Sequence, residues 1–171
     1  RSDVDAMTHV KRRRVVDLIP SVAFELAHGI GQKPPEIDQG DVAGNAMRLS
    51  EFHGKVVVLM FSFTGCGPCE EMYPGNRELV EELTAQPFVF VSIVRDPKVQ
   101  SVLESIASKK ITWRVWLDSD TTLSQQWNIR AWPTMYVMDS EGVIRFKDIR
   151  GESLKLAVRK LIDAAVPTPD K

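Results

Sequence analysis

Short apolar runs alternate along this chain with longer segments in which polar and apolar residues are mixed. The runs are rich in β-branched and aromatic residues, which is typical of buried strands. Strands are therefore predicted at 56–61, 88–94, 134–138 and 143–146, with a short extended piece at 113–117. Helices are predicted at about 67–84, 97–109, 121–127 and 153–165. The order of these elements indicates an α/β fold.

The connections between the predicted strands indicate a mixed sheet. The strands at 56–61 and 88–94 are joined by a long helix, so we expect them to run parallel with a right-handed crossover. The last two strands are joined by a short turn at 140–142, so we expect them to be antiparallel. Ahead of the first strand, residues 37–49 contain two glycines and predict a short hairpin.

The first 35 residues differ from the rest of the chain. A basic run at 11–14 precedes a rough helical stripe that Pro20 interrupts, and glycines and prolines at 29–35 predict a linker. We interpret this region as a solvated helix face packed on the domain, or as the tail of an upstream segment. An arm that binds nucleic acid or a membrane is the alternative. The predicted organisation is a helical extension and linker at 1–35, one domain at 36–166 and a tail at 167–171.

Composition narrows the class of protein. The chain has 171 residues, 43% hydrophobic and 26% charged, which suits one globular domain. A formal net charge of −1 argues against nucleic acid or an anionic membrane as a partner. No apolar run reaches the roughly 20 residues that span a bilayer. The chain starts at Arg1 and not at Met, so the lack of a visible secretory signal says little about its compartment.

The two cysteines, Cys66 and Cys69, enclose a Gly67-Pro68 pair where the first strand meets the following helix. Two thiols at this spacing can form a reversible disulfide. The helix N-terminus carries unpaired N–H groups and a partial positive charge, which favour a thiolate. We therefore predict that Cys66 is the nucleophile and that Cys69, further into the helix and less accessible, is the resolving thiol.

Two other interpretations of the cysteine pair are weaker. A zinc site needs four ligands, often with a second cysteine pair or paired histidines, and His9, His28 and His53 lack such spacing. An inert structural disulfide would close a loop so small that it restrains little chain entropy. A redox pair that needs no metal or cofactor is the favoured prediction.

Further motifs accompany the cysteine pair. Ala131-Trp132-Pro133-Thr134 directly precedes a strand, and the segments 40–69 and 139–144 follow a recognisable order of turns, strands and charged residues. Together they resemble the thioredoxin superfamily, and most closely its TlpA-like, redoxin-type thiol-disulfide proteins. The resemblance implies a thioredoxin-like fold: a mixed sheet of four to five strands flanked by helices, with an N-terminal hairpin. It also implies a helix and strand inserted at about 95–131, before the cis-proline loop.

The same resemblance assigns roles to single residues. Cys66 resembles the attacking thiol and Cys69 the resolving thiol. Gly67 and Pro68 complete the active-site motif, in which the proline tunes the redox balance. Pro133 resembles the cis-proline that faces the disulfide, where the missing N–H removes a donor from beside the sulfurs.

The neighbours of these residues both follow the family and depart from it. Pro74 matches the proline that kinks the active-site helix, since proline lacks one helical N–H and crowds the preceding turn. Trp132 would line the substrate groove and present its backbone for strand-like pairing with a partner peptide. Gly65 stands where the family usually has Trp, so aromatic bulk would move to Trp132 on the opposite rim. The alternative is that Trp132 simply packs inward.

Two departures concern proton transfer at Cys69. Met60 stands where thioredoxin has a buried Asp, and Ser92 stands roughly where it carries the partner lysine. The buried proton acceptor for Cys69 would then be missing, and Glu71 or a water is the candidate replacement. Glu71 can equally be an ordinary solvated acid of the first helical turn. We expect a higher pH optimum of reduction than in a relative with a buried carboxylate.

The predicted function is that of a thiol-disulfide oxidoreductase that reduces protein disulfides through a mixed disulfide on Cys66. The direction follows from the CGPC motif, which resembles that of reducing members. A peroxiredoxin-like thiol peroxidase is one alternative, but such enzymes need Thr or Ser three positions before the reactive cysteine, where this chain has Phe63. A non-catalytic binding module with a thioredoxin fold is the other.

The expected partners follow from this function. They are a protein or small-molecule disulfide substrate and an upstream electron donor of unassigned identity. We expect a monomer that uses no metal or cofactor, binds no nucleic acid, and meets a membrane only through a tether outside this chain. The resemblance implies an extracytoplasmic, periplasmic location.

Overall fold

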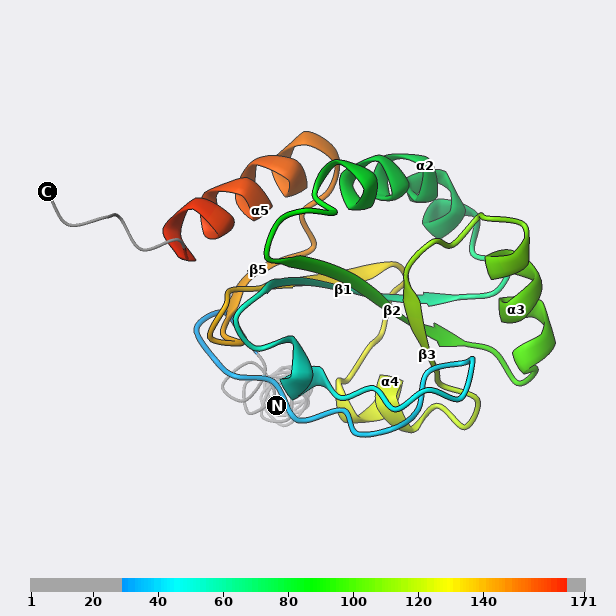
Figure 1. The fold of residues 1–171 in the computed structure, drawn as a ribbon. Helices are drawn as coiled ribbons and strands as arrows, with labels where there is room; N and C mark the ends of the chain where they lie inside the picture. Colours follow the sequence, from blue (N-terminus) through cyan, green and yellow to red (C-terminus); the bar gives the residue numbers. More distant parts are fainter. Residues whose placement is uncertain (1–28, 166–171) are drawn as a thin grey trace, which may run out of the picture.

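Five strands flanked by helices make up the described part of the chain, residues 29–165 of a computed structural model (Figure 1). The predicted tail at 167–171 and the greater part of the predicted extension at 1–35 lie outside these residues. No helix within 29–165 is long and apolar enough to cross a membrane.

The elements coincide with the predicted ones to within a few residues. The strands are β1 (Val56–Phe63), β2 (Phe88–Arg95), β3 (Arg114–Leu117), β4 (Thr134–Met138) and β5 (Ile144–Lys147). The helices are α2 (Gly67–Glu82), α3 (Val99–Ala107), α4 (Thr122–Gln126) and α5 (Gly151–Ala165), with a 3₁₀ helix, η1 (Leu49–Phe52), before β1. A proline suits the first turn of α2, because backbone N–H groups in that turn have no acceptor within the helix and the N–H that proline lacks is not missed there.

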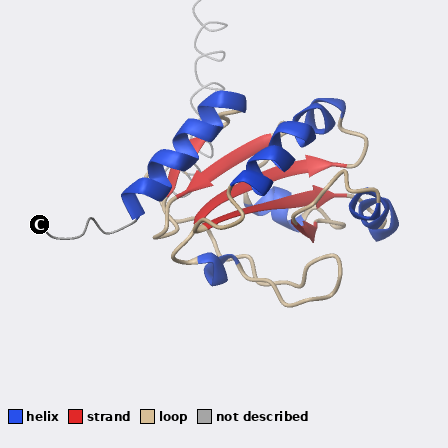
Figure 2. Ribbon diagram, turned by 45° about the horizontal axis from the view of Figure 1, so that its top comes forward, coloured by secondary structure: helices blue, strands red, loops and turns tan. Residues whose placement is uncertain are grey.

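The sheet has the strand order β3-β2-β1-β4-β5. β1, β2 and β3 are parallel, whereas β4 is antiparallel to β1 and β5 is antiparallel to β4. The predicted parallel crossover and antiparallel final pair are therefore confirmed. Helices α2 and α5 lie side by side over one face of the sheet, while α4 and η1 lie on the other (Figures 1 and 2).

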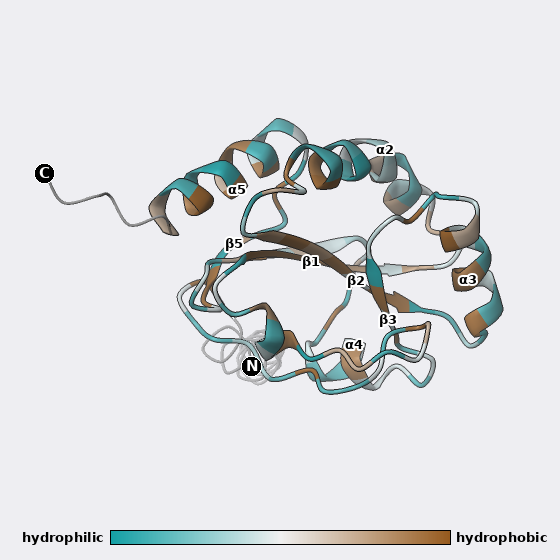
Figure 3. Cartoon of the chain, in the orientation of Figure 1, coloured by the Kyte–Doolittle hydropathy of each residue, from teal (hydrophilic) through white to brown (hydrophobic). Residues whose placement is uncertain are grey.

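The central strand, β1, is buried on both faces. Every residue from Val56 to Phe61 is at most 3% exposed, which explains why its sequence is a continuous apolar run and not an alternating one. Alternate side chains join two hydrophobic clusters, one under α2, α3 and α5 and the other toward η1 and α4. Figure 3 shows the apolar colour concentrated in these strands and in stripes along the helices.

The predicted hairpin at 37–49 takes a different form. Within this described segment the two arms run antiparallel but make one isolated bridge, between Asp38 and Arg48, instead of paired strands. The carboxylate of Asp41 explains this, because it accepts hydrogen bonds from two backbone N–H groups of the following turn, at 3.0 and 2.9 Å. Arg114 of β3 donates to the same carboxylate at 3.1 Å. Side-chain hydrogen bonds such as this one, together with a backbone bond from Val42 N to Val115 O at 2.9 Å, therefore anchor this segment to the sheet.

The end of the predicted linker also pairs with the sheet. Gly31 N donates to Ile144 O at 2.7 Å, and Ile144 N donates to Gln32 O at 2.9 Å. These bonds extend the outer edge of the sheet at β5. We therefore propose that the folded domain begins at or before Gly31, several residues earlier than the sequence pattern suggested.

Candidate active site

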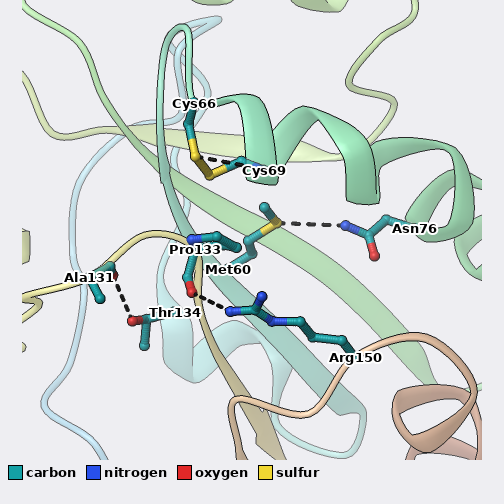
Figure 4. Close-up of a disulfide and its surroundings, with 8 residues drawn as sticks. All are labelled: Met60, Cys66, Cys69, Asn76, Ala131, Pro133, Thr134 and Arg150. Atoms are coloured by element: carbon teal, nitrogen blue, oxygen red, sulfur yellow. Dashed lines mark hydrogen bonds between the residues drawn. A yellow bond between two sulfur atoms is a disulfide. The ribbon is translucent and has the colours of Figure 1, made fainter.

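The carboxyl end of β1 places the two cysteines at the start of α2. Cys66 is the N-cap residue of this helix, and its O and Sγ atoms lie 3.0 and 3.3 Å from the donating Cys69 N. The two sulfur atoms form a disulfide, with the Cα atoms 5.2 Å apart (Figure 4). Both sulfurs thus lie at a helix end whose N–H groups and dipole stabilise negative charge.

Both cysteines are buried in this oxidised form. Cys66 is 1% exposed and Cys69 is 0% exposed, so the expected difference in access between them is absent here. The physical reason is that both side chains belong to the core cluster under α2, which also contains Met60 and Tyr73 and against which Trp132 packs. A partner can therefore reach Cys66 only if the surrounding side chains make room for it.

The turn between β1 and α2 requires a residue without a side chain. Gly65 has a φ of +82°, which lies in the left-handed region that other residues rarely adopt. The turn is closed by a hydrogen bond from Cys66 N to Phe63 O at 3.1 Å. A Trp at position 65 would be strained in this conformation, which gives a physical reason for the departure from the family pattern.

The loop with Pro133 lies among the residues that surround the disulfide (Figure 4). The Trp132–Pro133 peptide bond is cis, and Pro133 is buried. Two hydrogen bonds hold the loop: Thr134 Oγ1 donates to Ala131 O at 2.8 Å, and Arg150 Nη2 donates to Pro133 O at 3.1 Å. Arg150 immediately precedes α5, so the start of that helix is tied to this loop.

Trp132 is half-buried and packs against the hydrophobic clusters on both faces of the sheet. Its ring meets the ring of Phe63 edge-on, with centroids 5.9 Å apart. The guanidinium carbon of Arg95 lies 5.6 Å from the Trp132 ring centroid. The side chain therefore packs inward in part, and its role in a substrate groove stays a prediction.

Met60 occupies the core near the disulfide. It is 0% exposed, and it lies directly opposite Ser92 of β2 in the sheet register. Asn76 Nδ2 of α2 donates to the Met60 Sδ atom at 3.6 Å (Figure 4). Ser92 Oγ accepts a hydrogen bond from Trp113 Nε1 at 3.0 Å. Amide, thioether, hydroxyl and indole groups thus occupy this part of the interior, and the Met60 position offers no carboxylate.

Tyr73, one turn after Cys69, is a buried residue of α2 that carries a hydroxyl group. Burial raises the pKa of Tyr73, the nearby Ser62 hydroxyl partly offsets this, and the charge of Glu70 adds to the increase. Ser62 Oγ is itself buried and makes no hydrogen bond of regular geometry with the residues described. Tyr73 therefore stays protonated near neutral pH.

The sequence analysis missed Tyr73, Asn76 and Arg150. Tyr73 and Asn76 follow Cys69 by four and seven positions, a spacing that places all three on one helix face. That periodicity was a usable signal. The contact of Arg150 with Pro133 joins residues 17 positions apart, and no local sequence pattern predicts it.

The described contacts of Glu71 are with residues of α2 and α5 and not with the disulfide. It is exposed, and it lines a cavity of about 240 Å³ between α2 and α5, opposite Lys155. No described hydrogen bond or ion pair joins Glu71 to either cysteine. Its role as a proton relay stays a prediction.

A family model described as the AhpC/TSA family matches residues 30–147, more than half of the chain. The chain belongs to the AhpC/TSA family. The match spans β1 to β5, including the cysteine pair and the Pro133 loop.

Curated relatives and solved structures agree on the kind of protein that this chain resembles. It is 24% identical over 138 residues to "Thiol-disulfide oxidoreductase ResA" of Bacillus thuringiensis, covering 81% of this chain and 79% of the relative. It is 27% identical over 143 residues to the protein of the same name from Geobacillus kaustophilus, covering 82% and 80%. The thioredoxin domain of a thiol-disulfide oxidoreductase from Bacteroides vulgatus superposes with a TM-score of 0.71 at 26% identity, covering 78% and 97%. The thioredoxin-like fold predicted from the sequence is confirmed.

Two observations concern the alternative chemistries. The position that a thiol peroxidase fills with Thr or Ser holds Phe63, which is 38% exposed and contacts Trp132. Thr64 is exposed, and its backbone N lies 3.4 Å from Arg95 O. For zinc, residues 29–165 contain no group of three or more His, Cys, Asp or Glu side chains placed to hold a metal ion.

Proposed function

We propose that this protein is a thiol-disulfide oxidoreductase that reduces disulfides of partner proteins through Cys66 and Cys69. The observation that carries the proposal is the disulfide between these residues at the N-terminus of α2. The names of the relatives, which are thiol-disulfide oxidoreductases, support the same chemistry. The structure corresponds to the oxidised product of such a reaction.

The first step is attack by the Cys66 thiolate on one sulfur of the partner disulfide. The S–S bond of the partner breaks, a Cys66–partner disulfide forms, and the other partner sulfur leaves as a thiolate that takes up a proton. The helix N-terminus stabilises the attacking thiolate. We propose that the backbone at Trp132 and Pro133 aligns the partner chain by strand-like pairing beside the sulfurs.

The second step is attack by the Cys69 thiolate on Cys66 Sγ. The mixed disulfide breaks, the second partner thiol is released, and the Cys66–Cys69 disulfide forms. In total two electrons pass from the protein to the partner, and an upstream dithiol must return them. Gly67 and Pro68 keep the two sulfurs close enough to bond, because they are the two residues that separate the cysteines in the first turn of the helix.

A Cys69→Ser variant tests this proposal. Without the resolving thiol, reduced Cys66 should hold its partner as a stable mixed disulfide that mass spectrometry detects. A Cys66→Ser variant is the matched control and should trap nothing. Trapping by Cys66→Ser but not by Cys69→Ser would overturn the assignment of the nucleophile.

Further outcomes separate the alternative functions. Rapid consumption of peroxide by the reduced protein, far above the rate of a free thiol, would favour a peroxidase. Unchanged partner binding and no loss of turnover after replacement of both cysteines by Ser would favour a binding module. A potential at the strongly oxidising end, measured against a glutathione buffer, would reverse the proposed direction of electron flow.

The location and assembly of the protein are part of the same proposal. We propose a monomer that works outside the cytoplasm, on the basis of the TlpA-like resemblance. Light scattering of the purified chain tests the first point. Cell fractionation with an antibody to the native protein tests the second.

A further inference from the structure

Arg95 places a positive charge at the end of β2, close to the turn that leads to the disulfide. It ends β2 and lies opposite Phe63, three residues before Cys66. It is exposed, and its guanidinium makes no hydrogen bond or ion pair with any residue of the described chain. The other arginines of that part each donate at least one side-chain hydrogen bond: Arg48, Arg77, Arg114, Arg130, Arg145, Arg150 and Arg159.

Aromatic rings hold the Arg95 guanidinium in place. Its Cζ atom lies 5.6 Å from the ring centroid of Trp132, and that ring is braced edge-on by Phe63 at 5.9 Å. A guanidinium over an indole face is attracted by the ring and keeps its N–H groups free at its edge. The positive charge is therefore fixed beside the residue that precedes Pro133, with its donors unused.

A pocket of about 310 Å³ opens beside this stack, and we call it the Arg95 pocket. Its lining consists of Arg95, Trp132 and residues in and around α4: Thr121, Ser124, Gln125, Asn128 and Ile129. The lining holds a guanidinium, two amides and two hydroxyls but no carboxylate. The Ser124 hydroxyl donates to Asp118, and one N–H of the Gln125 amide donates to Thr121, so the donors left for a ligand are the guanidinium, the remaining amide N–H groups and the Thr121 hydroxyl.

Three acidic residues lie near the pocket without lining it. Asp118 is buried, and its carboxylate accepts three hydrogen bonds at the start of α4, from Leu123 N and from the N and Oγ atoms of Ser124. Asp120 accepts from Thr122 N at 3.0 Å. Asp96 is buried and accepts from Lys98 N at 2.7 Å. The carboxylates of Asp118 and Asp120 have backbone donors of their own, Asp96 Oδ2 has no hydrogen-bond partner among the described residues, and none of the three pairs with Arg95.

We propose that the Arg95 pocket binds an acidic side chain of the partner protein, a few residues from the disulfide that is reduced. A carboxylate can accept two parallel hydrogen bonds from a guanidinium and others from the amides of Gln125 and Asn128. An extended peptide advances about 3.3 Å per residue, so a side chain two or three residues from the partner cysteine reaches past the indole of Trp132. This inference rests on the proposed function and adds a substrate preference to it.

Matched peptide substrates test the preference. Two disulfide-bonded peptides would differ only in Glu or Gln near one cysteine, and the second-order rate constant of reduction by the reduced protein would be measured for each. We expect about a three- to tenfold faster reaction with the Glu peptide, the range of a partly screened charge-assisted contact. Arg95→Gln should abolish the difference, and Arg95→Glu should instead favour a peptide with Lys at that position.

Arg159→Gln is the matched control, because it removes the same charge from α5, where Arg159 pairs with Glu82. It should leave the preference for the Glu peptide intact. Equal rates for the Glu and Gln peptides with the wild-type protein, or a preference that survives in Arg95→Gln, would overturn the proposal. These outcomes differ from failure of the proposed function, in which the protein reduces neither peptide.

Discussion

Met60 places a thioether, and not a carboxylate, in the core cluster that contains Cys69. Its thioether is buried and accepts a hydrogen bond from Asn76, so it can neither bind nor release a proton. The buried hydroxyl of Tyr73, with its raised pKa, can donate but does not act as a base near neutral pH. Within residues 29–165 no described hydrogen bond joins Cys69 to a carboxylate, so water or Glu71 remains the candidate proton acceptor for Cys69.

Met60→Asp should therefore move the pH dependence of reduction to lower pH. The new carboxylate would be desolvated, which raises its pKa toward the working range of a general base. The second-order rate constant for reduction of a peptide disulfide, measured from pH 5 to 9, should rise at a lower pH than in the wild type. The cost should be about 2–4 kcal/mol of unfolding free energy, because a polar group replaces an apolar one in the core.

Met60→Leu is the control for this substitution. It preserves volume, should cost less than about 1.5 kcal/mol, and should leave the pH profile unchanged. Identical profiles for Met60→Asp and Met60→Leu, with both variants folded by thermal unfolding, would show that this position has no part in proton transfer.

Single residues also show what the sequence could predict about the site. Cys66, Cys69 and Pro133 stand in short motifs whose spacing is visible along the chain. Gly65 was noted as a departure, but its reason, a positive φ, emerged only from the backbone. The link between Arg150 and Pro133 depends on how α5 meets the sheet, and such tertiary contacts leave no periodic trace in the sequence.

Among the elements, the segment before β1 is held in part by the carboxylate of Asp41. Asp41 is partly desolvated, which would raise its pKa, but hydrogen bonds from Asn45, Arg114 and Ala43 outweigh this and hold the pKa of Asp41 below its ordinary value. A carboxylate with a lowered folded-state pKa stabilises the fold above its unfolded pKa of about 4. That stabilisation is lost as the pH falls through the lower folded-state value.

Asp41→Asn should accordingly destabilise the protein in a pH-dependent manner. At pH 7 we expect a loss of about 1–3 kcal/mol, because charge-assisted hydrogen bonds to the turn and to Arg114 are weakened. The difference from the wild type should shrink as the pH falls below about 4, where the carboxylate of the unfolded chain becomes protonated first and that of the folded chain follows at lower pH. Urea unfolding at pH 7 and pH 3 measures both values, and an equal difference at the two pH values would contradict the account.

The elements differ in how well their sequences specify them. β1 and β2 are buried on both faces in their central residues, so their apolar runs are long and their positions were predicted closely. The 37–49 segment was predicted as a hairpin from its glycines, but the side chain of Asp41 competes for the backbone N–H groups that a ladder would need. Local hydrogen bonds from the backbone to a side chain can therefore replace the paired strands that a glycine-rich turn pattern predicts.

At the scale of the whole molecule, the residues proposed to bind and reduce the partner lie at one edge of the sheet. The carboxyl ends of the parallel strands β1 and β2 carry the disulfide and the Arg95 pocket, and the loop before β4 carries Pro133 to the same edge. The parallel and antiparallel directions of two strand pairs were predicted, whereas the strand order, which brings these loops together, came from the structure. The burial of both cysteines and the pocket around Arg95 depend on side-chain packing, which the sequence alone did not reveal.

The most direct test of the account counts thiols in a single turnover. Reduced protein would be mixed with a disulfide-bonded partner, quenched with an alkylating reagent and analysed by mass spectrometry. The account predicts that each molecule that gains the Cys66–Cys69 disulfide yields two alkylated thiols on the partner. Partner thiols that appear while Cys66 and Cys69 stay reduced, or that appear equally with a variant in which both cysteines are Ser, would contradict it.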